Sequence, residues 1–168
     1  GKIIIFSKKI DEDYVYGVFQ TNDVLYDLGI VGALSPQLDE LLSVTELQMF
    51  NKSLIRINGV LGANAPLQNY FLVENGEISS FLLVDTGHAL EIDLDHDGIE
   101  EIVSSHGTPI TVFIYKWTED REFAIANVNS STDALSVYLN DENHFEVTFH
   151  DLTTRIFSYA SGVLKVVE

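Results

Sequence analysis

The chain has 168 residues, 46% of them hydrophobic, with no cysteine, and its 26 acidic and 9 basic residues give a formal net charge of −17. This length fits a single domain, residues 1–168, with a sizeable core, and the lack of cysteine excludes disulfides, thiolate metal sites and cysteine nucleophiles. The negative charge argues against nucleic acid as a partner, because phosphate backbones are bound by clustered Lys and Arg. No apolar run reaches transmembrane length, so we expect no transmembrane segment in this chain.

Most of the chain consists of short segments rich in Val, Ile, Phe and Tyr that are separated by turn residues, a pattern typical of antiparallel sheet. In chain order, the predicted strands are residues 3–6, 14–20, 24–29, 54–61, 69–74, 78–85, 89–94, 101–105, 111–117, 123–128, 135–139, 145–149, 155–159 and 163–167. Turn residues such as Asn75 with Gly76 and Ser161 with Gly162 predict hairpins between neighbouring runs. The sequence therefore predicts an all-β fold.

Residues 35–50 are the exception to the strand pattern. Ser35 can cap a helix, Pro36 suits a first helical position, and leucines then recur at helical spacing. We predict one short helix in this stretch, or two.

Three aromatic-rich hairpins resemble one another, at residues 69–84, 111–128 and 155–167. The offset between the first two is roughly 43 residues, near the length of a four-stranded propeller blade. Pro66 and Pro109 occupy matching places before them. We predict an antiparallel meander of four-stranded, propeller-like blades with one short helix; an irregular β-sandwich built from similar hairpins is the alternative.

The segment from residue 93 to residue 103 is an acidic loop that runs directly into a predicted strand. Asp93, Asp95, Asp97 and Glu101 stand at its first, third, fifth and ninth places, and Gly98 stands at the sixth. Oxygen donors at this spacing, with a glycine that permits a sharp bend, are what a hard cation such as calcium requires. The predicted metal ligands are one carboxylate oxygen each from Asp93, Asp95 and Asp97, the backbone carbonyl of Ile99, and the carboxylate of Glu101.

The loop is not a full EF-hand, because its twelfth place is Ser104 and the residues that follow look like a strand. No Lys or Arg lies between Arg56 and Lys116, so the loop lies in a strongly negative region whose stability should depend on a cation. His96, at an even place, should point away from the ion. A metal-free acidic turn, or another metal, is the alternative.

Residues 93–103 resemble the calcium-binding loop of the FG-GAP and VCBS repeats, which occur in integrin α-like β-propellers and in many secreted bacterial proteins. The resemblance covers roughly residues 89–128, the length of one blade, and includes the aromatic strand 112–117. It implies an extracellular or cell-surface setting, where calcium fills even a weak site. It also implies an exported bacterial protein or lipoprotein of unassigned role, with its signal or anchor removed.

Candidates for catalysis rest on sequence proximity alone. Ser105, His106 and Asp85 form a conceivable hydrolase set, but no Gly-x-Ser-x-Gly elbow is present. His88 and His106 are a conceivable zinc pair, but no His-Glu-x-x-His run supports them. The strand aromatics are either core residues or a carbohydrate-binding face: Tyr70, Tyr115 and Trp117.

The sequence thus predicts no catalytic residue and no organic cofactor. It predicts a calcium-binding extracellular or cell-surface β domain with a binding or structural role, whose partner is an unknown protein or carbohydrate at the cell surface. The alternative is a secreted hydrolase that acts on polysaccharide or peptide and holds calcium only as a structural ion.

Overall fold

The computed structural model describes residues 1–62 and 65–167. These residues form fifteen strands and two short helices, which confirms the all-β prediction. Contacts along the chain divide it into two compact units, Gly1–Asp85 and Thr86–Glu168. A single domain over residues 1–168 stays a prediction. Neither helix in the described part of the chain has the length and hydrophobicity needed to cross a bilayer.

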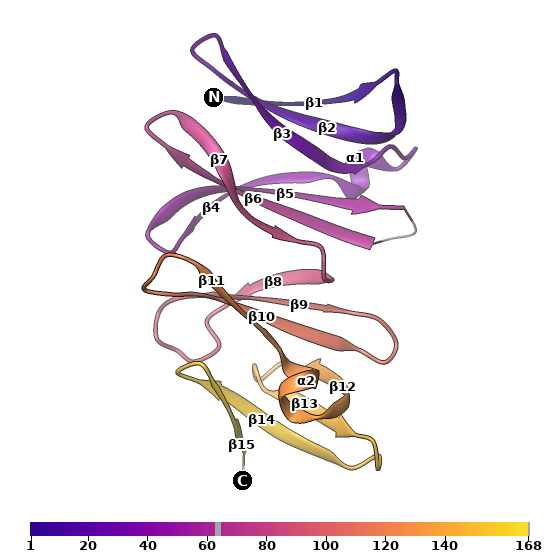
Figure 1. The fold of residues 1–168 in the computed structure, drawn as a ribbon, viewed down its shortest axis with the longest axis vertical. Coiled ribbons are helices and arrows are strands. Elements are labelled where there is room, and N and C mark those ends of the chain that lie inside the picture. The colour runs from indigo at the N-terminus through magenta and orange to yellow at the C-terminus, as the bar shows by residue number, and fades with distance from the viewer. Residues whose placement is uncertain (63–64, 168) are drawn as a thin grey trace. The chain divides into compact units, whose positions relative to one another are not determined.

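The first unit contains a three-stranded and a four-stranded sheet (Figure 1). Each is an antiparallel meander whose strand order follows the sequence. The elements are β1 (Lys2–Lys8), β2 (Asp11–Thr21), β3 (Val24–Ala33), α1 (Leu38–Leu41), β4 (Ser43–Met49), β5 (Lys52–Leu61), β6 (Ala65–Glu74) and β7 (Glu77–Val84).

The core of the first unit lies between its two sheets. Buried side chains from both sheets meet there: Val15, Phe19, Leu28, Val31, Ile55, Ile57, Phe71 and Ile78. The backbones of β3 and β5 approach so closely that a Cβ at Gly59 would collide with the carbonyl oxygen of Val31. Glycine at this position therefore sets the spacing between the sheets.

The second unit contains two four-stranded antiparallel meanders (Figure 1). The first is β8 (His88–Ile92), β9 (Glu101–His106), β10 (Thr111–Trp117) and β11 (Phe123–Asn127). The second, which follows α2 (Val128–Thr132), is β12 (Ala134–Leu139), β13 (Phe145–Phe149), β14 (Thr154–Ala160) and β15 (Val163–Val166). The α2 helix begins because the Asn127 side chain accepts a hydrogen bond from Ser130 N at 2.9 Å, as an N-cap does.

A second core joins the two sheets of this unit. Its buried members come from β9, β10, α2, β12, β13, β14 and the loop after β8: Leu94, Val103, Val112, Ile114, Val128, Val137, Phe145, Val147 and Tyr159. Full burial of side chains of this size stabilises the fold by about 1.5–3 kcal/mol each. The core therefore fixes β9 and β10, the strands that begin or end beside the acidic loop.

The structure confirms one short helix within residues 35–50, but the second half of this stretch is a strand that the sequence analysis did not predict. Only Leu38–Leu41 is helical; Gln37 is the N-cap residue, and no side chain caps this helix. Residues Ser43–Met49 form β4, which pairs with β5 along its whole length. Exposure alternates along β4, as is typical of a strand, but the helical spacing of the leucines made this alternation hard to recognise in the sequence.

The three hairpins that resemble one another in sequence take equivalent places in the structure. They are β6–β7, β10–β11 and β14–β15, the third and fourth strands of their sheets. In the described residues none of the four sheets closes on itself. Within each unit, two meanders that share a core fit a sandwich-like arrangement, while the propeller stays a prediction.

Candidate metal centre

The acidic loop joins β8 to β9 and is shaped by hydrogen bonds from its own backbone. Asp93 accepts from Asp97 N through Oδ1 at 3.1 Å and from Gly98 N through Oδ2 at 3.0 Å, and Asp97 Oδ1 accepts from Ile99 N at 2.7 Å. Positive φ angles at His96 (57°) and Gly98 (85°) complete the bend. The His96 side chain is exposed. Hydrogen bonds between residues of the loop itself therefore support its bend.

Three carboxylates of the loop and the strand after it converge. One oxygen from each of Asp93, Asp95 and Glu101 lies within 4.8 Å of the others. The side chain of Asp95 is only 4% exposed and that of Glu101 only 1%. Buried negative charges this close together need a positive charge among them. The group can hold a metal ion.

One buried oxygen of this group has no hydrogen-bond partner. Asp95 Oδ2 accepts from Ser161 N at 2.9 Å and from Lys116 Nζ at 3.3 Å. Asp95 Oδ1 is buried and has no partner among the described residues. A buried carboxylate oxygen loses hydration without replacement unless a proton donor or a cation meets it. Asp95 therefore offers a free ligand atom.

The backbone of the loop also holds Glu101, the residue at which β9 begins. Glu101 Oε2 accepts a hydrogen bond from Leu94 N at 3.2 Å, and Leu94 is itself a member of the second core. Asp95, the next residue, accepts a hydrogen bond from Ser161 N. Ser161 lies in the turn between β14 and β15, two strands that Figure 1 labels. The centre therefore joins the two sheets of the second unit.

Lys116 from β10 brings an ammonium group into this centre. Its Nζ lies 3.0 Å from Glu101 Oε1, 3.3 Å from Asp95 Oδ2 and 3.8 Å from Asp97 Oδ2, and its side chain is 27% exposed. The pKa of Lys116 is raised because ion pairs with Glu101 and Asp95 outweigh the burial that lowers it. Lys116 is thus positively charged at neutral pH.

The two most buried carboxyl groups respond differently to the same ammonium. Burial raises the pKa of Glu101, and hydrogen bonds from Lys116 and Leu94 only partly offset it. Burial also acts on Asp95, but hydrogen bonds from Ser161 and Lys116 outweigh it and lower its pKa. Asp95 is therefore an anion at neutral pH, ready to bind a cation.

Of the five predicted ligands, the structure brings Asp93, Asp95 and Glu101 together. Asp97 lies beside Lys116 with its side chain 41% exposed, and its Oδ1 is occupied by Ile99 N. The carbonyl of Ile99 stays a prediction. Ser104, at the twelfth place of the loop, faces the interior, where its hydroxyl lies 2.7 Å from that of Thr86.

Sequence reasoning missed Lys116 and Ser161. In the sequence, Lys116 marks only the end of the long stretch without basic residues. The strand register holds the missing signal: Tyr115 pairs with Ile102, so the next pair along the two strands is Lys116 with Glu101. The sequence predicts Ser161 only as a turn residue, and nothing in it indicates the hydrogen bond from Ser161 N to Asp95, 66 residues away.

The catalytic candidates do not converge in the second unit. Ser105 and His106 are consecutive residues of β9, so their side chains project from opposite faces of the sheet. His88 pairs with Ser105, which separates it from His106 in the same way. The described residues contain one His, Cys, Asp and Glu group with metal-binding spacing, and it includes neither histidine.

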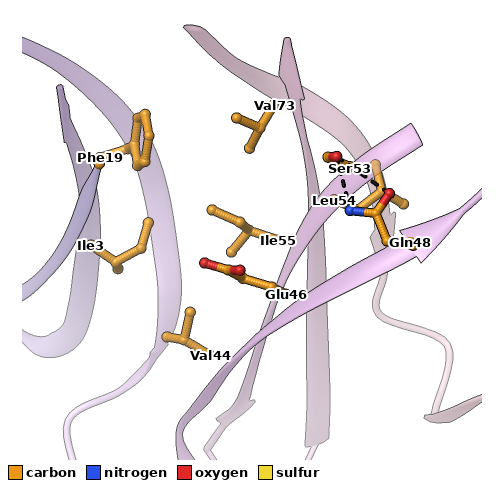
Figure 2. Close-up of a pocket in the computed structure, with 10 residues that line it drawn as sticks. Ile3, Phe19, Val44, Glu46, Gln48, Ser53, Leu54, Ile55 and Val73 are labelled. Atoms are coloured by element: carbon orange, nitrogen blue, oxygen red, sulfur yellow. Dashed lines mark hydrogen bonds between the residues drawn. The ribbon is translucent and has the colours of Figure 1, made fainter. Parts of the chain in front are cut away.

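A pocket of about 410 Å³ lies between the two sheets of the first unit. Figure 2 shows Ile3 and Phe19 facing Val44 and Ile55 across it, and Glu46 lies between Val44 and Ile55. Glu46 is the only acidic or basic side chain among the residues that line it. Gln48 and Ser53, at one end, hydrogen-bond to each other. The pocket thus lacks the paired acids or histidines of a hydrolytic site.

Two of the three strand aromatics are core residues. Tyr70 is fully buried and Tyr115 is 3% exposed. Trp117 is partly buried and makes an edge contact with Phe123, with ring centroids 4.9 Å apart. These three residues do not form an open carbohydrate-binding face.

Comparison with protein-family models, curated proteins and solved structures finds no match to this chain. The likeness of residues 93–103 to FG-GAP and VCBS loops stays a prediction from sequence.

Proposed function

We propose that this chain is a calcium-binding β domain that works outside the cell or at the cell surface, in a structural or binding role without catalysis. The observation that carries the proposal is the buried Oδ1 of Asp95, which has no hydrogen-bond partner among the described residues, in a residue whose carboxylate converges with those of Asp93 and Glu101. An oxygen-only donor set of this kind suits a hard divalent cation.

Asp93, Asp95 and Glu101 would hold the ion, with Asp97 and the Ile99 carbonyl as the further ligands that the loop spacing predicts. A bound calcium ion would neutralise the negative charge of the loop. The role of this chain's residues is to keep the loop bent, through the hydrogen bonds accepted by Asp93 and Asp97. A loop that is already bent loses little conformational entropy on binding.

The ion would also stabilise the packing of the second unit. Asp95 is hydrogen-bonded to Ser161, in the turn between β14 and β15, and Glu101 begins β9. A cation shared by these two carboxylates would connect the two sheets of the unit. This is a structural use of calcium, as expected where the ion is near millimolar and a weak site is filled.

Isothermal titration of chelator-treated protein with calcium tests the proposal. We expect saturable heat for the natural chain, little heat for Asp95→Asn, and unchanged heat for Asp120→Asn, an exposed acid of the same unit. Calcium should raise the melting temperature of the natural chain and of the Asp120 variant only. Equal melting curves with calcium and with chelator, together with a silent titration, would refute the site.

Within residues 1–62 and 65–167, no observation favours the secreted hydrolase. The pocket in the first unit contributes one acid, and the histidines of β8 and β9 lie on opposite faces of their sheet. Peptide and glycan substrates should therefore remain intact in the presence of the protein and calcium. Cleavage of a peptide or glycan by the homogeneous protein would support the hydrolase hypothesis.

A further inference from the structure

The ammonium of Lys116 contacts carboxylates that the proposed calcium ion would also use as ligands. Its three carboxylate contacts, to Glu101 at 3.0 Å, Asp95 at 3.3 Å and Asp97 at 3.8 Å, are to residues that the loop pattern assigns to the metal. A metal–oxygen bond for calcium is only about 2.3–2.6 Å long. An ion bound to the same carboxylates would therefore lie within a few ångströms of Nζ.

Lys116 is held there by the sheet. It follows Tyr115, which pairs with Ile102, so its side chain projects beside Glu101 for as long as β9 and β10 stay paired. Its local concentration at the site is fixed and does not depend on the solution. A free cation in the medium has no such advantage.

The surroundings of Lys116 also allow its side chain to move away from the carboxylates. The side chain is 27% exposed, so it can swing toward solvent without unfolding the strand. Its Nζ is 5.6 Å from the centroid of the Tyr159 ring, whose electron-rich face can keep contact with an ammonium that has left the carboxylates.

We propose that Lys116 is a tethered cation that competes with calcium for Asp95 and Glu101 and so sets the affinity of the site. This inference rests on the proposed function. Without metal, the ammonium compensates the buried acids and keeps the loop folded. With metal, the ion must displace the ammonium, and the free energy of the lost ion pairs is subtracted from that of binding.

Competition of this kind lowers affinity and leaves the ligand set intact. A weak site of ~10⁻⁴–10⁻³ M responds to calcium outside the cell and stays empty at cytosolic calcium levels. The lysine thus confines the metal-bound state to the compartment in which the proposed function places the protein.

Titration of the full chain with calcium, in the natural form and as Lys116→Met, tests the inference. We expect the variant to bind at least about tenfold more tightly, because the competing charge has gone and each tenfold corresponds to 1.4 kcal/mol. Lys52→Met is the matched control, since Lys52 pairs with Glu74 in the first unit at 3.4 Å. Its calcium affinity should equal that of the natural chain.

The melting temperature adds a second readout. Lys116→Met should melt at a lower temperature than the natural chain in chelator, and calcium should raise its melting temperature by more. Lys116→Gln, which keeps a polar side chain, serves if the methionine variant does not fold. In the natural chain, reductively methylated lysines can be followed by NMR, and the Lys116 signal should move on calcium addition while that of Lys52 stays.

The outcomes separate the two proposals. If the natural chain binds calcium and removal of Lys116 leaves affinity equal or weaker, the lysine is not a competitor, although the site stands. If only the variant binds, the competition is supported and calcium binding by the natural chain is refuted. If neither binds at about 10 mM calcium, far above the dissociation constant of a weak extracellular site, both proposals fail.

Discussion

Lys116 Nζ lies 3.0 Å from Glu101 Oε1, across the pair of strands β9 and β10, and Glu101 is 1% exposed. This ion pair places a positive charge beside the most buried acid of the acidic centre. The negative loop is therefore partly compensated by the chain itself, where the sequence alone pointed only to an external cation.

Glu101→Gln should destabilise the metal-free protein by about 1–3 kcal/mol, since it removes a buried partner of a charged lysine. Urea unfolding in chelator measures the change. Glu74→Gln is the control, because its pair with Lys52 is on the surface and its side chain is 60% exposed. That variant should stay within about 0.5 kcal/mol of the natural chain. Equal losses in the two variants would contradict a buried role for Glu101.

The stability of the metal-free protein should fall at alkaline pH. The pKa of Lys116 is raised in the folded state, so its stabilising effect is complete below its unfolded pKa of about 10.4 and is lost as pH rises through the folded value. The pKa of Tyr159, raised mainly by burial, adds a loss of the same sign. Urea midpoints at neutral and alkaline pH should therefore differ less for Lys116→Met than for the natural chain. If the urea midpoint falls equally with pH in both proteins, Lys116 contributes nothing to the pH dependence of stability.

Asp95→Ala should free the amide of Ser161, which donates to Asp95 Oδ2 at 2.9 Å. Hydrogen exchange at Ser161 N, followed by NMR in chelator, should then become faster. The amide of Gly29 donates to Asp27 Oδ1 in the first unit and should be unaffected. An unchanged rate at Ser161 would mean that the loop and the turn between β14 and β15 are not fastened together through this bond.

Gly59→Ala should destabilise the first unit by about 1–3 kcal/mol, because the added Cβ would collide with the carbonyl oxygen of Val31. Gly32→Ala is the matched control, since its Cβ would meet its nearest neighbour at an ordinary 3.5 Å. That variant should be neutral or slightly stabilising. Denaturant midpoints of the two variants measure the difference, and similar values would contradict the close approach of β3 and β5.

Features of the fold that depend on interactions between residues close in sequence were predicted correctly. The turn at Asn75 and Gly76 is local chemistry, and both residues have the positive φ, 54° and 82°, that such a turn requires. The bend of the acidic loop is equally local, because Asp93 accepts from amides four and five residues further on. Such features depend on neighbouring residues and can be predicted from them.

The strand at residues 43–49 was not predicted, because it depends on pairing with a different segment. Helical spacing of leucines is a weak preference, and pairing of β4 with β5 from Ser43 to Met49 satisfies many more backbone groups than a short helix does. The α2 helix was missed for a related reason, since a five-residue helix depends on the Asn127 cap more than on any periodicity.

The sequence by itself determined that the chain forms antiparallel strands, where its tight turns fall, and that a loop with carboxylates at alternate places lies between two of the strands. Periodicity, turn chemistry and donor spacing are short-range properties, which explains why they can be read directly. Only the tertiary structure decided which charge faces that loop and which oxygen is left unpaired. Lys116 and Ser161 reach Asp95 through strand pairing and sheet packing, and these contacts exist only once distant segments have folded together.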